Sequence, residues 1–302
     1  MRSKTKILLI ALAIALTVSP LVVAQEEPSA SSAGDMLQFG TDAKSLGMGG
    51  AFVAVADNYS ATYWNPAGLG QVEGFNIGGM AYKPYDINGL DYVFGSGSFS
   101  LGQVTVGGGY SQFGADMGNT DTFYNHEGSY REGMAIGSVA LNLDIFNAGA
   151  NLKYYSLPEG GGVGFDGGML VKFDGISLGA VAQDIGVEEV PMAFRVGGAV
   201  DFLDLVLASV QLDLIGDATT LRAGVEVTPI ELMAIRAGLA MPQAEGVDAS
   251  FSVGGGLNLA GLTVDVAYMT NGAAFSGRDN TGGTLVLSAG FEFAGMTEEG
   301  SA

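Results

Sequence analysis

The sequence of 302 residues contains no cysteine and a single histidine, His126. Without cysteine there are no disulfide bonds, no zinc sites with cysteine ligands, no thiol nucleophile and no lipid-modified cysteine. A Ser-His-Asp triad would have to use His126, which follows Asp121 and precedes Glu127 in a predicted loop. A loop metal site and a solvated histidine are the two alternatives, and no metal-binding spacing favours the first. We therefore expect no enzymatic activity, no metal and no cofactor.

Basic residues are also scarce, since 12 Lys and Arg stand against 32 Asp and Glu and give a net charge of -20. No basic stripe can neutralise phosphates, which excludes nucleic acid as a partner. The first basic residues instead precede an apolar run from Ile7 to Val18. This order predicts a secretory signal peptide over residues 1–24, cleaved after Ala24. The alternative is an anchor helix that is not cleaved.

Beyond that segment the chain lacks any apolar run long enough to cross a bilayer as a helix, although 48% of its residues are hydrophobic. In residues 262–268, for example, the even positions hold Leu, Val, Val and Tyr, and the odd positions hold Thr, Asp and Ala. Successive side chains of a strand point to opposite faces, so this alternation predicts a strand between two environments. The predicted strands are 72–82, 90–100, 102–113, 129–142, 145–156, 163–173, 175–184, 191–201, 204–214, 219–227, 231–240, 250–259, 261–269 and 283–294.

About fourteen such strands, with no helical pattern between them, are typical of a transmembrane β-barrel. The predicted connections alternate in length: residues 83–89 and 114–128 form long ones, whereas Leu101, Asp144 and Asp174 mark tight turns. Bacterial barrels place their short turns and both termini in the periplasm. We therefore predict an all-β, antiparallel barrel in the outer membrane of a diderm bacterium, with its outer face against outer-membrane lipid.

The alternation also assigns each side chain to one face of the predicted barrel. A charge that faces lipid at mid-bilayer costs roughly 2–4 kcal/mol, so charged residues are expected in the lumen. The predicted lipid-facing residues are Phe146, Ala148, Ala150, Leu152, Tyr154, Phe194, Val196, Val200, Leu221, Val225, Val227, Leu285, Leu287, Phe291 and Phe293. The predicted lumen residues are Asn147, Asn151, Lys153, Arg195, Asp201, Arg222, Glu226, Ser288 and Glu292. The aromatic residues expected in girdles at the membrane surfaces are Tyr82, Tyr110, Tyr130, Tyr155, Phe202 and Tyr268.

One segment, residues 40–71, does not alternate and is rich in glycine and apolar residues. It precedes the first strand and therefore starts at the periplasmic end, where water would surround it. Packing inside the barrel as a hatch would bury it, as large barrels allow. The predicted organisation is a signal peptide over 1–24, a flexible linker over 25–39, the hatch over 40–71, the barrel over 72–294 and a tail over 295–302.

Two stretches of the hatch segment carry a motif: Ala43 to Ala54 reads A-K-S-L-G-M-G-G-A-F-V-A, and Trp64 to Leu69 reads W-N-P-A-G-L. They resemble the N-terminal signature of the PorV/PorQ family (UPF0164-like) and, more distantly, of FadL-type outer-membrane transporters of hydrophobic compounds. The resemblance implies a FadL-like barrel of about fourteen strands, with the Asn-Pro-Ala box in a hatch that fills the lumen. The hatch motif comprises Gly47, Gly49, Gly50, Trp64, Asn65, Pro66, Ala67 and Gly68.

Four charged residues of the predicted lumen lie on three consecutive strands. Pairing of these strands places Asp213 opposite Arg222 and Arg222 opposite Arg236. A cluster of Asp213, Arg222, Glu226 and Arg236 would be able to latch the hatch to the wall. The alternative is that the four residues form ion pairs between strands that fill the lumen.

Two functions are compatible with these predictions. The resemblance to the PorV/PorQ family implies a role in envelope transport or protein secretion, in which outer loops over 114–128 and 270–282 hold secreted or envelope proteins. The alternative is a FadL-like passive transporter of hydrophobic small molecules, which requires an apolar pocket in the lumen and an opening in the wall beside the hatch. The short outer loops of this compact chain are nearer to those of the PorV/PorQ family.

Overall fold

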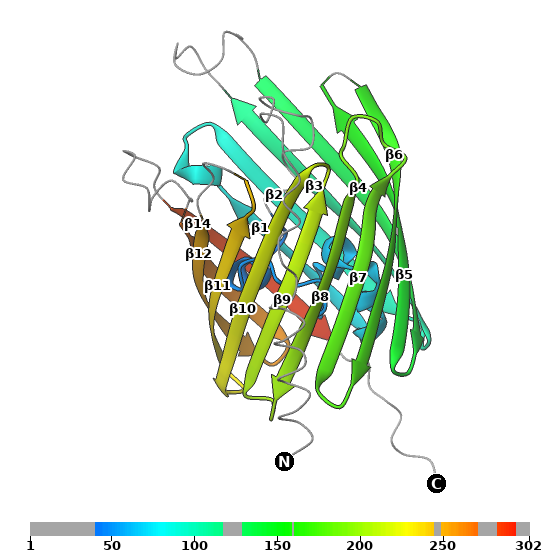
Figure 1. The fold of residues 1–302 in the computed structure, drawn as a ribbon, viewed down its shortest axis with the longest axis vertical. Coiled ribbons are helices and arrows are strands. Elements are labelled where there is room, and N and C mark those ends of the chain that lie inside the picture. The colour runs from blue at the N-terminus through cyan, green and yellow to red at the C-terminus, as the bar shows by residue number, and fades with distance from the viewer. Residues whose placement is uncertain (1–39, 117–128, 159, 245–248, 271–282, 294–302) are drawn as a thin grey trace.

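The computed structural model describes residues 40–116, 129–158, 160–244, 249–270 and 283–293 (Figure 1). In this part of the chain fourteen strands form a closed antiparallel barrel, in which sequence neighbours pair and β1 closes the sheet against β14. The predicted fold class is therefore confirmed. The strands are β1 (Phe75–Tyr82), β2 (Leu90–Ser100), β3 (Val104–Asp116), β4 (Ser129–Leu143), β5 (Phe146–Leu157), β6 (Gly160–Phe173), β7 (Ile176–Ile185), β8 (Ala193–Phe202), β9 (Val206–Ile215), β10 (Ala218–Ile230), β11 (Met233–Pro242), β12 (Ser250–Leu259), β13 (Leu262–Met269) and β14 (Thr284–Phe293).

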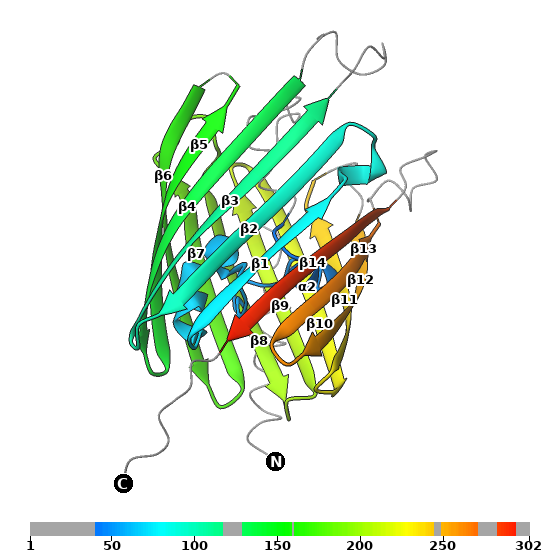
Figure 2. The same ribbon diagram turned by 180° about the vertical axis from the view of Figure 1, so that it is seen from behind.

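The hatch, residues 40–71, lies inside the barrel, where Figures 1 and 2 show it in blue with strands on all sides. Phe52 and Leu69 are fully buried there. None of the helices in the described residues is long and apolar enough to cross a membrane. The helices are α2 (Ala43–Gly47), α3 (Ala61–Trp64), the 3-10 helix η2 (Pro66–Gln71), and the 3-10 helix η3 (Pro84–Asp86) between β1 and β2.

Six turns of two or three residues join the strands at the end of the barrel where β1 begins and β14 ends. The turn between β6 and β7 shows why they are tight: Asp174 has φ 49° and Gly175 has φ 77°. Two consecutive residues with positive φ match the twist of a hairpin, and Asp-Gly is a favoured pair for them. Because short turns and termini are periplasmic in bacterial barrels, this end faces the periplasm.

The outer face of the barrel is apolar. Leu152, Tyr154 and Leu285 are between 54% and 59% exposed, as expected where lipid replaces water. All the predicted lipid-facing residues have this orientation, because strand parity was read correctly from the alternation. Asp201 and Glu292 stand on the lumen side but are exposed, since they lie at the periplasmic ends of their strands. A closed barrel with this apolar exterior belongs in an outer membrane.

The predicted aromatic girdle is wrong for three of its six residues. Tyr82 and Tyr155 are 8% and 0% exposed and point into the lumen, because they share the parity of the lumen-facing Met80 and Lys153. Tyr130 has the parity of the lumen-facing Met134, although it is 39% exposed near the start of β4, and its ring lies 6.3 Å from that of Phe113. The other three residues of the predicted girdle, Tyr110, Phe202 and Tyr268, are at least 39% exposed.

Candidate functional site: the hatch and the lumen above it

Capping hydrogen bonds within the hatch stabilise its short helices. The Asp42 carboxylate accepts a hydrogen bond from the Ser45 N–H at 2.7 Å and caps α2. Asn65 caps η2 in the same way, accepting from the Ala67 N–H at 3.1 Å, and Pro66 supplies the first helical residue. Asp42 and Asn65 therefore begin two of the three short helices of the hatch.

Two motif side chains join separate parts of the hatch. The Trp64 indole N–H donates to the Ser45 hydroxyl at 3.1 Å and so ties α3 to α2. The Asn65 amide donates to the carbonyl of Val53 at 2.9 Å and to that of Met169 on β6 at 3.0 Å. A buried side chain that bridges two backbone segments can be replaced only at the cost of unpaired groups. Trp64 and Asn65 therefore serve the internal structure of the hatch and its attachment.

Polar side chains of the wall hold the hatch backbone on opposite sides of the lumen. The Gln211 carbonyl oxygen accepts from the N–H groups of Phe52 and Val53 at 2.8 and 2.7 Å. The Ser252 hydroxyl accepts from the Gly49 N–H and donates to the Gly47 carbonyl, both at 3.1 Å. These bonds satisfy backbone groups that no helix or sheet pairs. Further bonds to hatch carbonyls come from Ser96, Asn142, Asn151, Gln183, Ser209 and Arg222.

Glycines of the wall let the hatch backbone touch the strands. Gly224 on β10 lies opposite Gly238 on β11, and the backbone of Met48 and Gly49 occupies the space beside both. A Cβ atom at either position would overlap that backbone. A glycine in a strand marks close approach of another backbone, which is its role here. The wall glycines with this role are Gly149, Gly179, Gly224 and Gly238, whereas Gly168 and Gly197 lie against hatch side chains, those of Asn65 and Val53.

The predicted charge cluster divides into two groups. Arg222 pairs with Asp213 at 2.7 Å and donates to the Gly49 carbonyl at 2.9 Å. Arg236 instead pairs with Glu226 and, at 2.6 Å, with Asp265 of β13. The four residues therefore do not meet as one cluster, although each group lies in the lumen and contacts the hatch, the first through Gly49 and the second through Lys44, whose ammonium is 3.9 Å from Glu226.

The predicted pairing of these strands is wrong, and turn positions explain why. Asp213 lies opposite Thr220, because Gly216, at φ 55°, places the β9–β10 turn earlier than predicted. Arg222 lies opposite Gln211 and Ala240, not Arg236. Asp213 and Arg222 still meet because diagonal neighbours on one face are within reach of long side chains.

A buried ion cluster that the sequence did not predict lies on β5, β6 and β7. The Lys153 ammonium is 2.7 Å from Asp184 and 3.0 Å from Asp166, and its side chain is fully buried. The Tyr155 hydroxyl also donates to Asp184, and the Asn151 amide donates to Asp166 at 2.7 Å. Lys153, Asp166 and Asp184 form what we call the Lys153 cluster.

The Lys153 cluster coincides with a break in the wall. The pairing of β6 with β7 shifts between Phe165 and Gly167, a β-bulge at which Asp184 adopts φ 63°. The Asp184 N–H donates to the Asp166 carboxylate at 2.9 Å instead of to a strand carbonyl. Because a bulge reorients side chains, Asp184 points inward although strand parity assigns it to the lipid face. The alternation of side chains along β7 therefore could not predict this cluster.

Hatch residues meet cations of the lumen through rings and carboxylates. The Arg195 guanidinium lies 5.6 Å from the Tyr63 ring centre and 5.5 Å from that of Trp64. Burial raises the pKa of Tyr63 although Arg195 opposes this, so Tyr63 stays neutral. Lys44 pairs with Asp57 at 2.8 Å. Burial alone would lower the pKa of Lys44, but the Asp57 and Glu226 carboxylates outweigh burial and raise it, so Lys44 stays charged.

Apolar side chains fill the lumen between the hatch and the outer end. The rings of Tyr82 and Tyr92 are tilted by 59° with their centres 5.5 Å apart, and the ring of Phe94 lies 6.5 Å from that of Tyr63 of the hatch. The wall side chains in this space, which we call the outer-lumen cluster, belong to one buried apolar group. Its members are Met80, Tyr82, Tyr92, Phe94, Met134, Ile136, Tyr155, Leu157, Val187, Val190 and Val286.

Several predicted features cannot be placed. His126, the loops over 114–128 and 270–282 in large part, the signal peptide, the linker and the tail lie outside the described residues. Among the residues that the structure does describe, no group of three or more His, Cys, Asp or Glu could hold a metal ion.

No family model matches the sequence, and no curated protein is similar to it. Among solved structures the chain is similar to the CymD monoaromatic hydrocarbon channel, with a TM-score of 0.64 and 14% identity over 84% of this chain and 98% of that one. The fold is that of the FadL-like hydrocarbon transporters. The Ralstonia pickettii toluene transporter TbuX gives a TM-score of 0.61 at 14% identity, over 84% of this chain and 98% of that one. The P. putida toluene transporter TodX gives a TM-score of 0.59 at 12% identity, over 84% of this chain and 99% of that one.

Proposed function

We propose that the chain binds small apolar molecules in the lumen above the hatch and carries them across the outer membrane. The observation that supports this is the apolar character of the outer-lumen cluster; its side chains fill the lumen, with Tyr92, Phe94 and Met134 at most 3% exposed, so an entering solute displaces them. Porins that pass polar solutes have polar, water-filled lumens. An apolar lining favours an apolar solute. The similar structures described as hydrocarbon and toluene transporters are consistent with that class of solute.

The hatch favours a route through the wall. Because side chains from β2, β4, β5, β7, β9, β10 and β12 all bond its backbone, its displacement would break many hydrogen bonds at once. The β-bulge between Phe165 and Gly167 interrupts the pairing of β6 with β7 beside the lumen. We propose that apolar solutes leave the lumen toward the bilayer at this bulge, which requires the Lys153 cluster that fills its lumen side to move.

The single tryptophan of the chain provides a test. Trp64 is 4% exposed and lies in the hatch, with its ring 5.3 Å from that of Tyr63. Titration of the purified protein with toluene should change Trp64 fluorescence to saturation. Ile136→Ser, which makes the lumen polar, should weaken toluene binding about tenfold. Val139→Ser on the lipid face of the same strand is the matched control and should leave the affinity unchanged. Absence of a saturable change would contradict the proposal.

A role in protein secretion or envelope transport, as in the PorV/PorQ family, is the second candidate. The hydrogen bonds that hold the hatch in the lumen favour this second candidate, since a closed lumen suits a protein that holds partners and does not pass solutes. The motif from Ala43 to Leu69 supports the same assignment. Co-purification from outer membranes, with lipid extraction and partner identification in one sample, distinguishes the two candidates. Bound apolar compounds favour transport, and a stoichiometric envelope protein favours secretion.

A further inference from the structure

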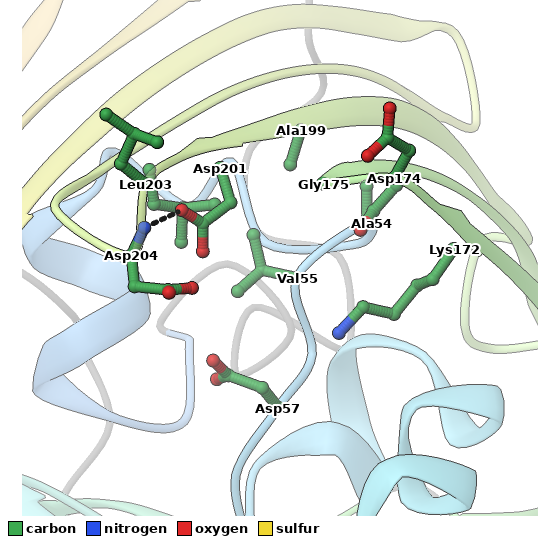
Figure 3. Close-up of a pocket in the computed structure, with 12 residues that line it drawn as sticks. Ala54, Val55, Asp57, Lys172, Asp174, Gly175, Ala199, Asp201, Leu203 and Asp204 are labelled. Atoms are coloured by element: carbon green, nitrogen blue, oxygen red, sulfur yellow. Dashed lines mark hydrogen bonds between the residues drawn. The ribbon is translucent and has the colours of Figure 1, made fainter.

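A pocket of about 360 Å³ opens at the periplasmic end of the barrel, and Figure 3 shows the side chains that line it. Ala54, Val55 and Asp57 of the hatch form one side of it. The turns between β6 and β7 and between β8 and β9 form the others. Its volume is near the lower limit of ligand sites, which suits a single side chain better than a whole lipid.

The pocket combines an apolar surface with carboxylates. Figure 3 shows Val55 in the middle, with the carboxylates of Asp57, Asp201 and Asp204 turned toward the hollow. The Lys172 ammonium faces them from the opposite side. Basic side chains have an apolar stem and a charged head, so they match this combination.

Two of the carboxylates have no cation beside them. Asp57 is paired with Lys44, and the Lys172 ammonium donates to the Gln71 side chain at 2.6 Å. No described cation lies within 4.0 Å of the carboxylate of Asp201 or of Asp204. The Asp201 carboxylate accepts a hydrogen bond from the Asp204 N–H at 3.0 Å. Among the described residues that line the pocket, Lys172 is the single cation, and its ammonium bonds the neutral Gln71 side chain, so the pocket presents a net negative charge to the periplasm.

An exposed leucine stands at the rim. Leu203 lines the pocket, is 91% exposed and adopts φ 58° at the tip of the β8–β9 turn. It is more exposed than any other large apolar side chain in the described residues. Apolar side chains inside a charged rim are typical of protein–protein interfaces.

We propose that this pocket is a docking site for a periplasmic polypeptide segment that carries a basic side chain beside an apolar one. The basic group lies between Asp201 and Asp204, its stem covers Val55, and the apolar neighbour covers Leu203. Charge complementarity selects the partner, and contact with the hatch residue Val55 couples docking to the periplasmic side of the lumen. This site is independent of the transport of apolar solutes.

The test uses a fluorescein-labelled peptide of alternating Arg and Leu and the full mature chain in zwitterionic lipid nanodiscs. Fluorescence anisotropy should detect binding that is absent with empty nanodiscs. The double variant Asp201→Asn with Asp204→Asn should weaken binding at least about tenfold. An asparagine at position 201 still accepts the hydrogen bond from the backbone N–H of residue 204. An asparagine at position 204 tolerates the positive φ found there, so the turn should fold.

The matched control removes two other periplasmic charges. Asp144→Asn with Glu231→Gln changes the net charge equally, at turns outside the pocket, and should alter the affinity less than about twofold. A counterpart peptide with Glu in place of Arg should not bind. Equal losses in both double variants, binding of the Glu peptide, or no binding of the Arg peptide would each overturn the proposal.

Discussion

Gly149 on β5 lies directly opposite Gly168 on β6, and the hatch fills the space that side chains would occupy at both positions. The backbone of Pro66 and Ala67 lies against Gly149, and the Asn65 side chain lies against Gly168. The backbone of the wall is thus in direct contact with the hatch at both glycines. Such contacts leave no room for adjustment, since protein interiors are close-packed.

Substitution of a wall glycine should loosen the hatch. In Gly149→Ala the new methyl group would overlap the Pro66 backbone, so the free energy of unfolding in urea should fall by about 1–3 kcal/mol. Gly255→Ala on the outer face of β12 is the control, because its nearest neighbour would be the Ala234 carbonyl at 3.7 Å. That variant should differ from the wild type by no more than about 0.5 kcal/mol. Equal effects would contradict hatch-to-wall packing at Gly149.

Removal of Arg222 distinguishes a latch from ion pairing. Arg222→Ala deletes the bonds to Asp213 and to the Gly49 carbonyl and should lower the free energy of unfolding by about 1–3 kcal/mol. We expect planar bilayers that contain the variant to remain closed, because Gln211 and Ser252 still hold the hatch. Stepwise currents in Arg222→Ala, absent from an Arg131→Ala control at the outer mouth, would assign the gate to Arg222.

The Lys153 cluster should be intolerant of losing its cation. Lys153→Met leaves the Asp166 and Asp184 carboxylates buried together without a counter-charge, which should cost about 3–5 kcal/mol of unfolding free energy. Asp184→Asn in the same chain should restore part of the loss. Lys172→Met at an exposed position is the control. A loss in Lys153→Met no larger than in this control would show that the cluster contributes little to stability.

The pair of Lys44 and Asp57 predicts a dependence on pH. Burial alone would raise the pKa of Asp57, but Lys44 outweighs burial and lowers it below its ordinary value. The stability from the pair is therefore complete above the unfolded pKa of about 3.9 and is lost as the pH falls through the folded pKa. Asp57→Asn should destabilise the protein at pH 7, and the difference should shrink below about pH 4. A difference that stays constant would contradict the assignment.

Strand positions and faces could be predicted because lipid imposes one rule on every outward side chain. Leu152 and Tyr154 are exposed and Lys153 between them is buried, as alternation requires. The same rule would have placed Tyr155 inside, but its position near a strand end favoured the girdle. Hydrophobic alternation thus decides which face of the barrel wall a side chain occupies, and proximity to a strand end does not.

Register and hatch contacts could not be predicted, because they depend on residues far apart in sequence. The turn at Gly216 and the bulge at Asp184 each change the pairing by local backbone geometry that alternation does not record. The glycines beside Met48, Gly224 and Gly238, lie far from it in sequence, on β10 and β11. The hatch motif indicated a plug, but only the fold shows which side chains hold it.

The hatch is the first part of the barrel region in the sequence, yet the N–H of Ala43 donates to the Ser288 hydroxyl on the last strand at 3.1 Å. Ser288 also lies opposite Met80 on β1, in the seam that closes the barrel. Ser288 thus takes part both in the seam that closes the barrel and in the attachment of the hatch. A chain cut before β14 would therefore have neither a seam nor a complete seat for its hatch.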